Sequence, residues 1–590
     1  MAASSGNAFD FKLFKRLLEY TQAYKWTFYF VGIAAVLLSF FAVLRPYLLQ
    51  ITIDNSIVPQ DNDQLLFYIG LMAGVLLLEV IFQFCFIYFA NWLGQEVIRD
   101  LRVNLFEHML EFKMKYFDNS AVGRLVTRAV SDIETIASIF SQGLFMIISD
   151  LLKMLVVLGF MFYQSWKLTL LVLLVLPFIL YATRIFQKKM KAAFEEVRTQ
   201  VANLNTFVQE RITGMKIVQL FTREEKEYER FKEINDKHRK GWIKTVWYNS
   251  IFFPIAEMST SITIGLIVWY GGLRVMAESE AITLGVIVAF IELSQMLFRP
   301  LRQIADKFNT LQMGMVAANR VFGILDTQAS IADNGTIQID HLKGEIEFKK
   351  VHFGYIEGEE VLKGISFKAE AGQTVAIVGA TGAGKSTIIN LLNRSYEING
   401  GNILVDGIDV KDITLKSLRA QIAIVLQDVF LFADTILNNI TLNHPEITKE
   451  TVIQAAKDIG VHEFISSLPG GYDYNVKERG VMLSSGQRQL IAFLRAYVSN
   501  PSILVLDEAT SSVDSYSEQL IQDATLKITE GRTSIVIAHR LATVKKADKI
   551  LVMDAGEIVE TGTHSELLQK ENGYYKNLYE VQFMQEEETL

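Results

Sequence analysis

The glycine-rich stretch Gly379-Ala-Thr-Gly-Ala-Gly-Lys-Ser-Thr387 follows an apolar run at 375–378 and precedes a helix-forming run at 387–393. It matches the pattern G-x-x-x-x-G-K-[ST], in which backbone N–H groups surround phosphates, the lysine reaches the terminal phosphates and the next hydroxyl binds Mg²⁺. Its position between a strand and a helix predicts an α/β nucleotide-binding domain. The residues expected to contact the nucleotide in this loop are Gly379, Thr381, Gly382, Gly384, Lys385, Ser386 and Thr387.

The composition indicates a membrane half joined to a water-soluble half. The chain has 590 residues, of which 50% are hydrophobic, and its mean hydropathy is +0.25. That is too apolar for a soluble enzyme, while the second half is too charged for a protein buried in lipid. The formal net charge is −8 and no block of five like charges occurs, so a nucleic-acid partner is not expected. Cys85 is the single cysteine, which excludes an intrachain disulfide.

Long apolar segments predict six membrane-spanning helices in the first half. Most of these segments approach or exceed the ~20 residues that a helix needs to cross about 30 Å of hydrocarbon. The last segment is the weakest, because Glu292 and Gln295 interrupt it and Pro300 follows. The predicted spans are residues 26–54, 65–95, 141–163, 166–184, 250–271 and 283–298.

Lysine and arginine are concentrated in two of the connections between these spans. Six basic residues lie between the second and third spans, and fifteen lie from Arg184 to Lys244. Because basic loops stay on the cytoplasmic side, both termini and the nucleotide-binding half are expected in the cytoplasm, with the chain in the cell (inner or plasma) membrane. Both connections are rich in helix formers, which predicts that the spans continue as helices beyond the bilayer.

The N-terminus carries basic residues without a short apolar region and a small-residue cleavage site. No cleaved signal peptide is therefore expected. The amphipathic run 11–18 is interpreted either as a helix on the inner membrane surface or as a plain solvated helix.

Three carboxylates fall at membrane depth, on Glu79, Glu257 and Glu292. Ionisable groups inside a bilayer are costly. Each is therefore either part of a path for a substrate or an ion, or a hydrogen-bonded or protonated group at an inner helix seam. Both interpretations stay open.

The sequence pattern changes after Asp326. Residues 327–343 are polar and contain a turn-prone Asp-Asn-Gly, so they are expected to form a linker between a transmembrane domain at 1–326 and an α/β domain at 344–590. Helical stretches alternate with several short apolar strands in this second domain, as an α/β core requires. The predicted strands are residues 345–348, 374–378, 421–426, 502–506, 533–538 and 549–553.

The apolar strand 503–506 ends in Asp507 and Glu508. An acidic residue at the carboxyl end of a strand beside a phosphate loop is where Mg²⁺ is held, and a second carboxylate next to it can polarise the attacking water. Asp507 and Ser386 are therefore expected to bind Mg²⁺, and Glu508 is expected to act as the catalytic base.

Between these two motifs lies Leu483-Ser-Ser-Gly-Gln-Arg-Gln489, and here the chain resembles the ATP-binding cassette transporters. It is similar to the exporter class, in which one six-helix membrane domain precedes one P-loop ATPase domain, and the resemblance covers nearly the whole chain. In such proteins two ATPase domains sandwich two ATP molecules, each between the phosphate loop of one subunit and the signature motif of the other. The resemblance implies ATP and Mg²⁺ as ligands and a second half-transporter as partner.

The resemblance also implies roles for single residues. Tyr355 matches the aromatic residue that stacks on adenine, and His539 matches the histidine that contacts the γ-phosphate. Gln427 matches the glutamine that links Mg²⁺ and the attacking water to the membrane domain. The residues that match signature positions contacting the partner's ATP are Ser484, Gly486 and Gln487.

The membrane half agrees with this resemblance, with one departure in the ATPase half. Residues 117–124 and 221–227 look like the two coupling helices that dock on the ATPase domains. Ser485 stands where the signature usually has its first glycine, which brings the equivalence of the two ATP sites into question. A homodimer is favoured, and the alternative is the competent half of a heterodimer.

The resemblance implies an ATP-driven exporter of amphipathic or hydrophobic substrates, drug-like or lipid, that works by alternating access in the lipid bilayer. Its catalytic residues would be Glu508, His539 and Gln427. A flippase for lipids of the lipid A type is the closest alternative. A nucleotide-gated channel or regulatory membrane protein is disfavoured by the presence of Glu508 and His539, and an importer is disfavoured by the fusion of the two domains.

Overall fold

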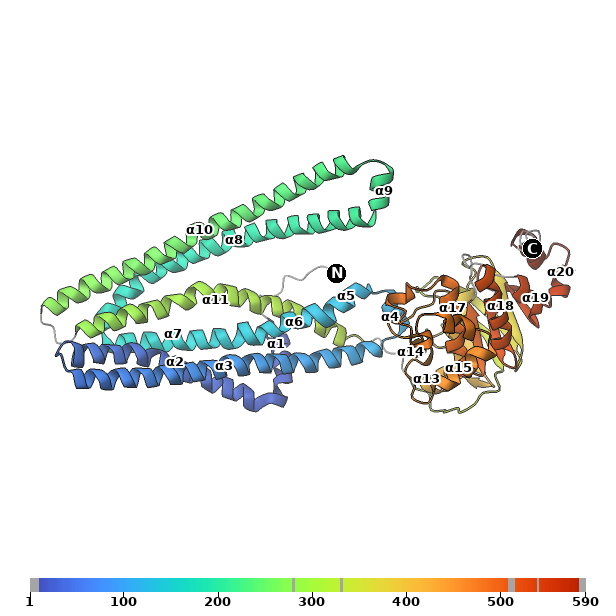
Figure 1. Cartoon of the computed structure of the whole chain (residues 1–590), viewed down its shortest axis with the longest axis horizontal. Coiled ribbons are helices and arrows are strands. Elements are labelled where there is room, and N and C mark those ends of the chain that lie inside the picture. Colours follow the sequence, from blue (N-terminus) through green and yellow to red (C-terminus); the bar gives the residue numbers. More distant parts are fainter. Residues whose placement is uncertain (1–9, 278–281, 329–332, 508–514, 539–540, 583–590) are drawn as a thin grey trace. The chain divides into compact units, whose positions relative to one another are not determined.

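The computed structural model describes residues 10–277, 282–328, 333–507, 515–538 and 541–582. The chain forms two compact units, one made of residues 1–110 and 121–328 and the other of residues 111–120 and 329–590. Figure 1 shows long helices in the first unit and sheets covered by helices in the second.

The first unit is all helical. Among the described residues it has six helical segments long and apolar enough to cross a membrane, as predicted from the sequence. Widened π-type turns at 53–57, 128–132 and 139–144 extend or join some of these helices. The helices are α1 Phe11–Glu19, α2 Lys25–Thr52, α3 Asn62–Leu110, α5 Val122–Thr127, α6 Ile133–Ser138, α7 Phe145–Gln164, α8 Trp166–Thr213, α9 Met215–Leu220, α10 Glu224–Met276 and α11 Leu284–Leu325.

Several of these helices are much longer than a bilayer is thick. Helices α3, α8 and α10 have 49, 48 and 53 residues. At a rise of 1.5 Å per residue they reach about 70–80 Å, against about 30 Å of hydrocarbon. The prediction that the spans continue as helices beyond the bilayer is confirmed. Helices α8 and α10 run as an antiparallel pair that α9 joins at one end (Figure 1).

The amphipathic run near the N-terminus forms helix α1, which packs partly against other helices of the first unit. Asp10 caps α1 by accepting hydrogen bonds from the N–H groups of Lys12 and Leu13. Phe14 and Leu17 are buried, because this side of α1 packs against neighbouring helices that include α11, while Phe11 is exposed. Arg16 forms an ion pair with Asp326 at the end of α11, at 2.7 Å.

The second unit contains two sheets. One is antiparallel in the order β2-β1-β4-β5, and the other has the order β10-β9-β3-β8-β7-β6. In the larger sheet β6, β7, β8, β3 and β9 are parallel, and β10 is antiparallel to β9. The strands are β1 Ile346–Phe353, β2 Leu362–Ala369, β3 Thr374–Gly379, β4 Gly400–Val405, β5 Ile408–Asp409, β6 Ile422–Val425, β7 Ile503–Asp507, β8 Thr533–Ile537, β9 Lys549–Asp554 and β10 Glu557–Gly562.

Helices cover the larger sheet and complete two apolar cores. Every residue of β7 and β8 is buried, as expected for strands in the middle of a parallel sheet. One core packs α17 against this sheet, and the other packs α12 between the two sheets. The helices of this unit are α4 Met114–Asp118, α12 Lys385–Leu392, α13 Leu415–Gln421, α14 Ile436–Thr441, α15 Lys449–Asp458, α16 His462–Ser467, α17 Ser485–Val498, α18 Ser515–Thr529, α19 Leu541–Lys546, α20 His564–Leu568 and α21 Tyr574–Gln582.

Asp406, in the turn between β4 and β5, holds the backbone just before β1 by hydrogen bonds. Its carboxylate accepts hydrogen bonds from the backbone N–H groups of Lys343, Gly344 and Glu345, at 2.6, 3.0 and 2.8 Å. Its own φ is +51°, a left-handed conformation that Asp and Asn tolerate better than most residues. One side chain thus satisfies three backbone donors.

Replacing Asp406 by alanine is expected to destabilise the second unit by about 2–4 kcal/mol, because the three N–H groups lose a charged acceptor. In a unit of this size that corresponds to a melting temperature about 5–10 °C lower, measured by scanning fluorimetry on the purified full-length chain. Asp406→Asn is the matched control and should lose less than half as much, since its amide oxygen still accepts. A loss below 1 °C in Asp406→Ala would show that the three bonds add nothing to stability.

Candidate functional site

The phosphate loop occupies the turn between β3 and α12. Gly379, the last residue of β3, has φ +152°, and a Cβ there would lie 2.2 Å from the carbonyl oxygen of Met553. Gly384 caps α12 with φ +98°, and a Cβ there would lie 2.7 Å from Leu362. Only glycine fits both positions. The loop therefore brings its backbone N–H groups and the start of α12 to the end of β3, an arrangement suited to binding phosphate.

Lys385 lies across this loop. Its Nζ donates hydrogen bonds to the carbonyl oxygens of Gly379 and Ala380, at 2.8 and 2.9 Å. The side chain is buried, and this burial lowers the pKa of the ammonium, while the negative charge of Asp507 raises it. The bonds to the loop fix the ammonium at the place where the terminal phosphates are expected.

Ser386, in the first turn of α12, and Asp507, at the end of β7, are brought together across the sheet edge. Asp507 ends β7 and is 9% exposed, and its Oδ2 accepts a hydrogen bond from Ser386 Oγ at 3.2 Å. Magnesium prefers oxygen ligands and is usually held by one or two carboxylates together with substrate phosphates. A hydroxyl and a carboxylate beside a phosphate loop fit that preference. In the described part of the chain, no group of three or more His, Cys, Asp or Glu side chains is placed to hold a metal ion.

The parallel pairing of the strands places the ends of β6, β7 and β8 at the same edge of the sheet. Val425 of β6 pairs with Leu506 of β7, and Asp507 pairs with Ile537 of β8. Gln427 follows β6 and is exposed at this edge. Glu508 and His539 follow β7 and β8 in the sequence, but both lie outside the described residues.

Tyr355 lies beside α12, close to the phosphate loop. Its hydroxyl donates a hydrogen bond to Thr387 Oγ1 and accepts one from Asn390 Nδ2, both at 3.3 Å. Its ring meets those of Phe353 and Tyr396 edge-on, at centroid distances of 4.9 and 5.0 Å. The ring is half-buried, so one part of it is accessible to a base bound at the loop.

The signature segment begins the long helix α17. Ser484 and Gln487 form a reciprocal cap, in which Ser484 Oγ accepts from the N–H of Gln487 and Gln487 Oε1 accepts from the N–H of Ser484. Ser485 is the first helical residue and is exposed, while Gly486 is buried. A serine adopts this helical conformation without strain, so the missing glycine leaves the start of α17 intact.

A contact that no sequence motif indicated joins α4 to Tyr396, which precedes β4 in the sequence. The hydroxyl of Tyr396 donates a hydrogen bond to the carboxylate of Asp118 in α4. The pKa of the Tyr396 hydroxyl is raised, mainly by burial and to a smaller degree by this hydrogen bond. The segment 117–124 that resembles a coupling helix begins at the end of α4 and ends within α5. Tyr396 in turn contacts Tyr355. The second such segment, at 221–227, lies where α9 meets α10.

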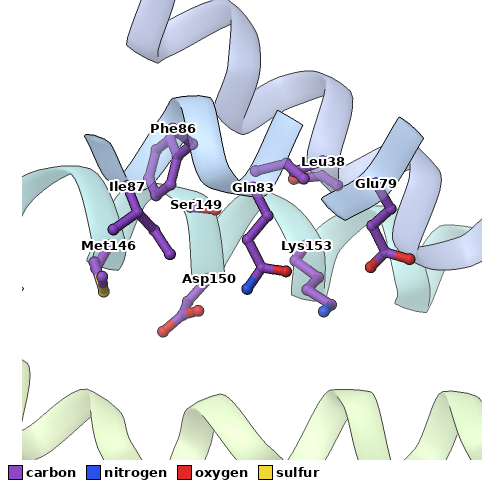
Figure 2. Close-up of a pocket in the computed structure, with 10 residues that line it drawn as sticks. Leu38, Glu79, Gln83, Phe86, Ile87, Met146, Ser149, Asp150 and Lys153 are labelled. Atoms are coloured by element: carbon purple, nitrogen blue, oxygen red, sulfur yellow. The ribbon is translucent and has the colours of Figure 1, made fainter. Parts of the chain in front are cut away.

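In the first unit, two of the predicted membrane carboxylates face other charged or polar groups. Glu292 lies 3.8 Å from Arg45. Glu79 lines a cavity together with Asp150 and Lys153 (Figure 2). Glu257 is exposed on α10.

The sequence analysis missed the partners of these carboxylates. Asp150 and Lys153 lie inside the third predicted span, and Asp150 forms an ion pair with Lys307 of α11. The presence of Asp150 and Lys153 inside an apolar segment was the sequence signal that could have identified these partners.

Comparison with known proteins supports the resemblance along both halves. Residues 28–301 match the family described as ABC transporter transmembrane region, and residues 362–511 match the family described as ABC transporter. The uncharacterized ABC transporter ATP-binding protein YknV of Bacillus subtilis (strain 168) is 37% identical over 571 residues, which cover 96% of this chain and 94% of that protein.

Two further relatives have names that describe transport. An ATP-dependent lipid A-core flippase of Idiomarina loihiensis is 37% identical, over 97% of this chain and 98% of its own. The putative multidrug export ATP-binding/permease protein YgaD of Bacillus subtilis (strain 168) is 34% identical, over 96% of this chain and 99% of its own. With matches along almost its whole length, the chain belongs to the ABC transporters and is an ATP-hydrolysing transporter whose transmembrane and ATP-binding regions are carried on one polypeptide.

Proposed function

We propose that this chain is one half of a dimeric exporter, which uses ATP to move amphipathic or hydrophobic molecules, drug-like or lipid, across the cell membrane. The observation that carries the proposal is the meeting of Lys385, Ser386 and Asp507 at the phosphate loop. The same chain has six helices apolar enough to span a membrane. A nucleotide site of this kind and a transmembrane region on one polypeptide support ATP-driven transport.

The residues of the phosphate loop bind and orient the nucleotide. The backbone N–H groups from Gly382 to Ser386 surround the phosphates, and the ammonium of Lys385 balances their charge. Ser386 Oγ and the Asp507 carboxylate would hold Mg²⁺, with Gln427 at the same edge of the sheet. When bound, Mg²⁺ neutralises charge on the phosphate oxygens.

Two residues beyond the described strands carry the hydrolytic step in this proposal. Glu508 follows the buried strand β7 and accepts a proton from the attacking water as the general base. His539 follows β8 and contacts the γ-phosphate. The strands that precede them, β7 and β8, are adjacent and parallel and end at the edge where Asp507 lies.

The second subunit completes the site. The start of α17 presents Ser484, Gly486 and Gln487 to the ATP of the partner, where the positive end of the helix favours phosphate. We propose a homodimer, because Ser485 keeps the helical conformation and Gly486 is retained. A heterodimer in which this chain is the competent half is the alternative.

Helix α4 is the proposed link from the nucleotide site to the membrane helices. It lies in the connection between α3 and α5, and Asp118 contacts Tyr396 within the ATP-binding unit. A movement of this unit on ATP binding or hydrolysis would therefore be transmitted along α3 and α5. We propose that it turns the membrane halves from inward-open to outward-open.

The substrate class follows the relatives. One is named a lipid A-core flippase and another a putative multidrug exporter, and both names describe amphipathic or hydrophobic cargo. A lipid flippase is thus the nearest alternative to a drug exporter. Stimulation of ATP hydrolysis by a panel of drugs and lipids, with the purified protein in nanodiscs, distinguishes the two.

Glu508→Gln is expected to lower ATP turnover by about 10²–10⁴-fold while nucleotide still binds, because the general base is lost and the shape is kept.

Lys385→Ala is expected to weaken ATP binding itself, by about tenfold or more, since a charge-assisted contact is removed. Turnover and binding of a fluorescent ATP analogue are measured on the same samples, with Lys416→Ala, an exposed lysine on α13, as the control. Turnover of Glu508→Gln within threefold of the parent would remove Glu508 from the role of base.

The orientation inferred from the basic loops predicts that the α2–α3 turn is extracellular and the ATP-binding unit cytoplasmic. In a Cys85→Ser background, Asn62→Cys and Lys416→Cys both place a thiol at an exposed position. A membrane-impermeant maleimide added to intact cells should label the first and not the second. Labelling of both from outside would overturn the proposed topology.

The homodimer predicts that the chain expressed alone hydrolyses ATP at a steady rate. Ser485→Gly should change this rate by less than about threefold, because the serine already fits the first turn of α17. The measurement is ATPase activity of the single purified chain, whose dimeric mass is checked by light scattering. A lone chain that is inactive and recovers only with a second, different subunit would establish the heterodimer instead.

A further inference from the structure

A cavity of about 190 Å³ lies among α2, α3 and α7 in the first unit. Its polar wall is made by Glu79, Gln83, Asp150 and Lys153, and apolar side chains such as Phe86 and Met146 line the rest. Figure 2 shows the four polar side chains pointing to the same side of the helices, with Phe86 and Met146 toward one end of the row. Since α3 and α7 belong to predicted spans, these charges lie at membrane depth.

The charged side chains around this cavity carry both signs, but not all of them form ion pairs. Asp150 is neutralised by an ion pair with Lys307 of α11. Among the described residues, Oε2 of Glu79 is buried and has no hydrogen-bond partner. Lys153 interacts with Glu79 and Asp150 through its charge, yet no ion pair within 4.0 Å joins it to either.

Two arginines also act on Lys153, and neither of them lines the cavity. Arg45 lies 3.8 Å from Glu292, and Arg299 is exposed and is not part of the lining. Glu79 and Lys153 thus attract each other across the cavity without a direct ion pair, and Glu79 Oε2 is left without a hydrogen-bond partner. Buried charged groups at membrane depth are costly unless they are closely paired, so an occupant that contacts both is favoured.

We infer that this cavity binds the head group of a zwitterionic amphiphile, with its ammonium at Glu79 and its phosphate or carboxylate at Lys153. A head group with one net charge would leave one of these two side chains unsatisfied. The volume is below the roughly 300–1,000 Å³ typical of sites for whole drug-sized ligands, and it suits a head group alone. The attached hydrocarbon chain leaves along the apolar end, past Phe86 and Met146. This inference names the substrate class and so rests on the proposed transport function.

The test compares three single-chain amphiphiles of equal chain length on the full-length protein in maltoside micelles. Lysophosphatidylethanolamine has both charges, lysophosphatidylglycerol has only the anionic group, and an alkylamine has only the ammonium. Equilibrium binding of the radiolabelled probes and stimulation of ATP hydrolysis are measured together. The zwitterion should bind about tenfold or more tighter than either of the other two, since it gains both charged contacts.

Two single variants assign the two contacts. Glu79→Gln should weaken binding of the zwitterion and the alkylamine about tenfold while leaving the anionic probe within twofold. Lys153→Gln should weaken the zwitterion and the anionic probe and leave the alkylamine within twofold. The exchanged double variant, Glu79→Lys with Lys153→Glu, should regain preference for the zwitterion, and Glu107→Gln, an exposed carboxylate further along α3, is the control.

Equal affinities for the three probes in the unmodified protein would overturn the inference, whether or not any variant folds. Equal losses for all three probes in both single variants, with a lower melting temperature, would show instead that Glu79 and Lys153 only stabilise the helices. A different result would contradict the proposed transport function. In that case no amphiphile would stimulate ATP hydrolysis, while the order of the three binding affinities would stay as expected.

Discussion

The parallel pairing of β6, β7, β8 and β3 is the constraint on which the nucleotide site depends. It brings the carboxyl ends of strands that are far apart in the sequence to one edge of a sheet. Asp507 meets Ser386 there, and Gln427 emerges beside them. The phosphate loop completes this edge because glycine at 379 and 384 lets the backbone pass close to Met553 and Leu362. A side chain at 379 would collide with the backbone of Met553, and one at 384 would force a strained φ of +98°.

A second constraint acts in the membrane helices, where charge must be compensated in a medium without water. Asp150 is paired with Lys307, and Glu292 lies near Arg45, so charges on different helices offset one another. Glu79 and Lys153 are the exception, since they face a cavity without an ion pair between them. In the ATP-binding unit the charge of Lys385 is held at the phosphate loop by two carbonyl oxygens. In the membrane unit Glu79 and Lys153 are the charges that we propose contact a head group.

The sequence predicted the elements that carry a strong local signal. Strands β3, β7, β8 and β9 are continuous apolar runs, and each was expected close to its observed position. Strands β2, β4, β5 and β10 were not predicted, because they lie in the antiparallel part or at an edge and mix polar with apolar residues. The amphipathic helix α1 was predicted as a helix, but its packing was not, since an apolar face looks the same whether it meets lipid or protein.

The sequence by itself determined that the chain has six apolar helices and a phosphate loop, because each depends on residue types at short, regular spacings. Its ordered motifs carried the resemblance to the ABC transporters, which the comparisons confirmed. Only the tertiary structure decided that Asp118 meets Tyr396 and that Asp150 is neutralised by Lys307, 157 residues away. It also decided that Glu79 lines a cavity with Lys153, while Glu257, in a similar apolar segment, is exposed. Contacts of this kind depend on how helices rotate and pack against one another, and local sequence patterns do not determine that rotation.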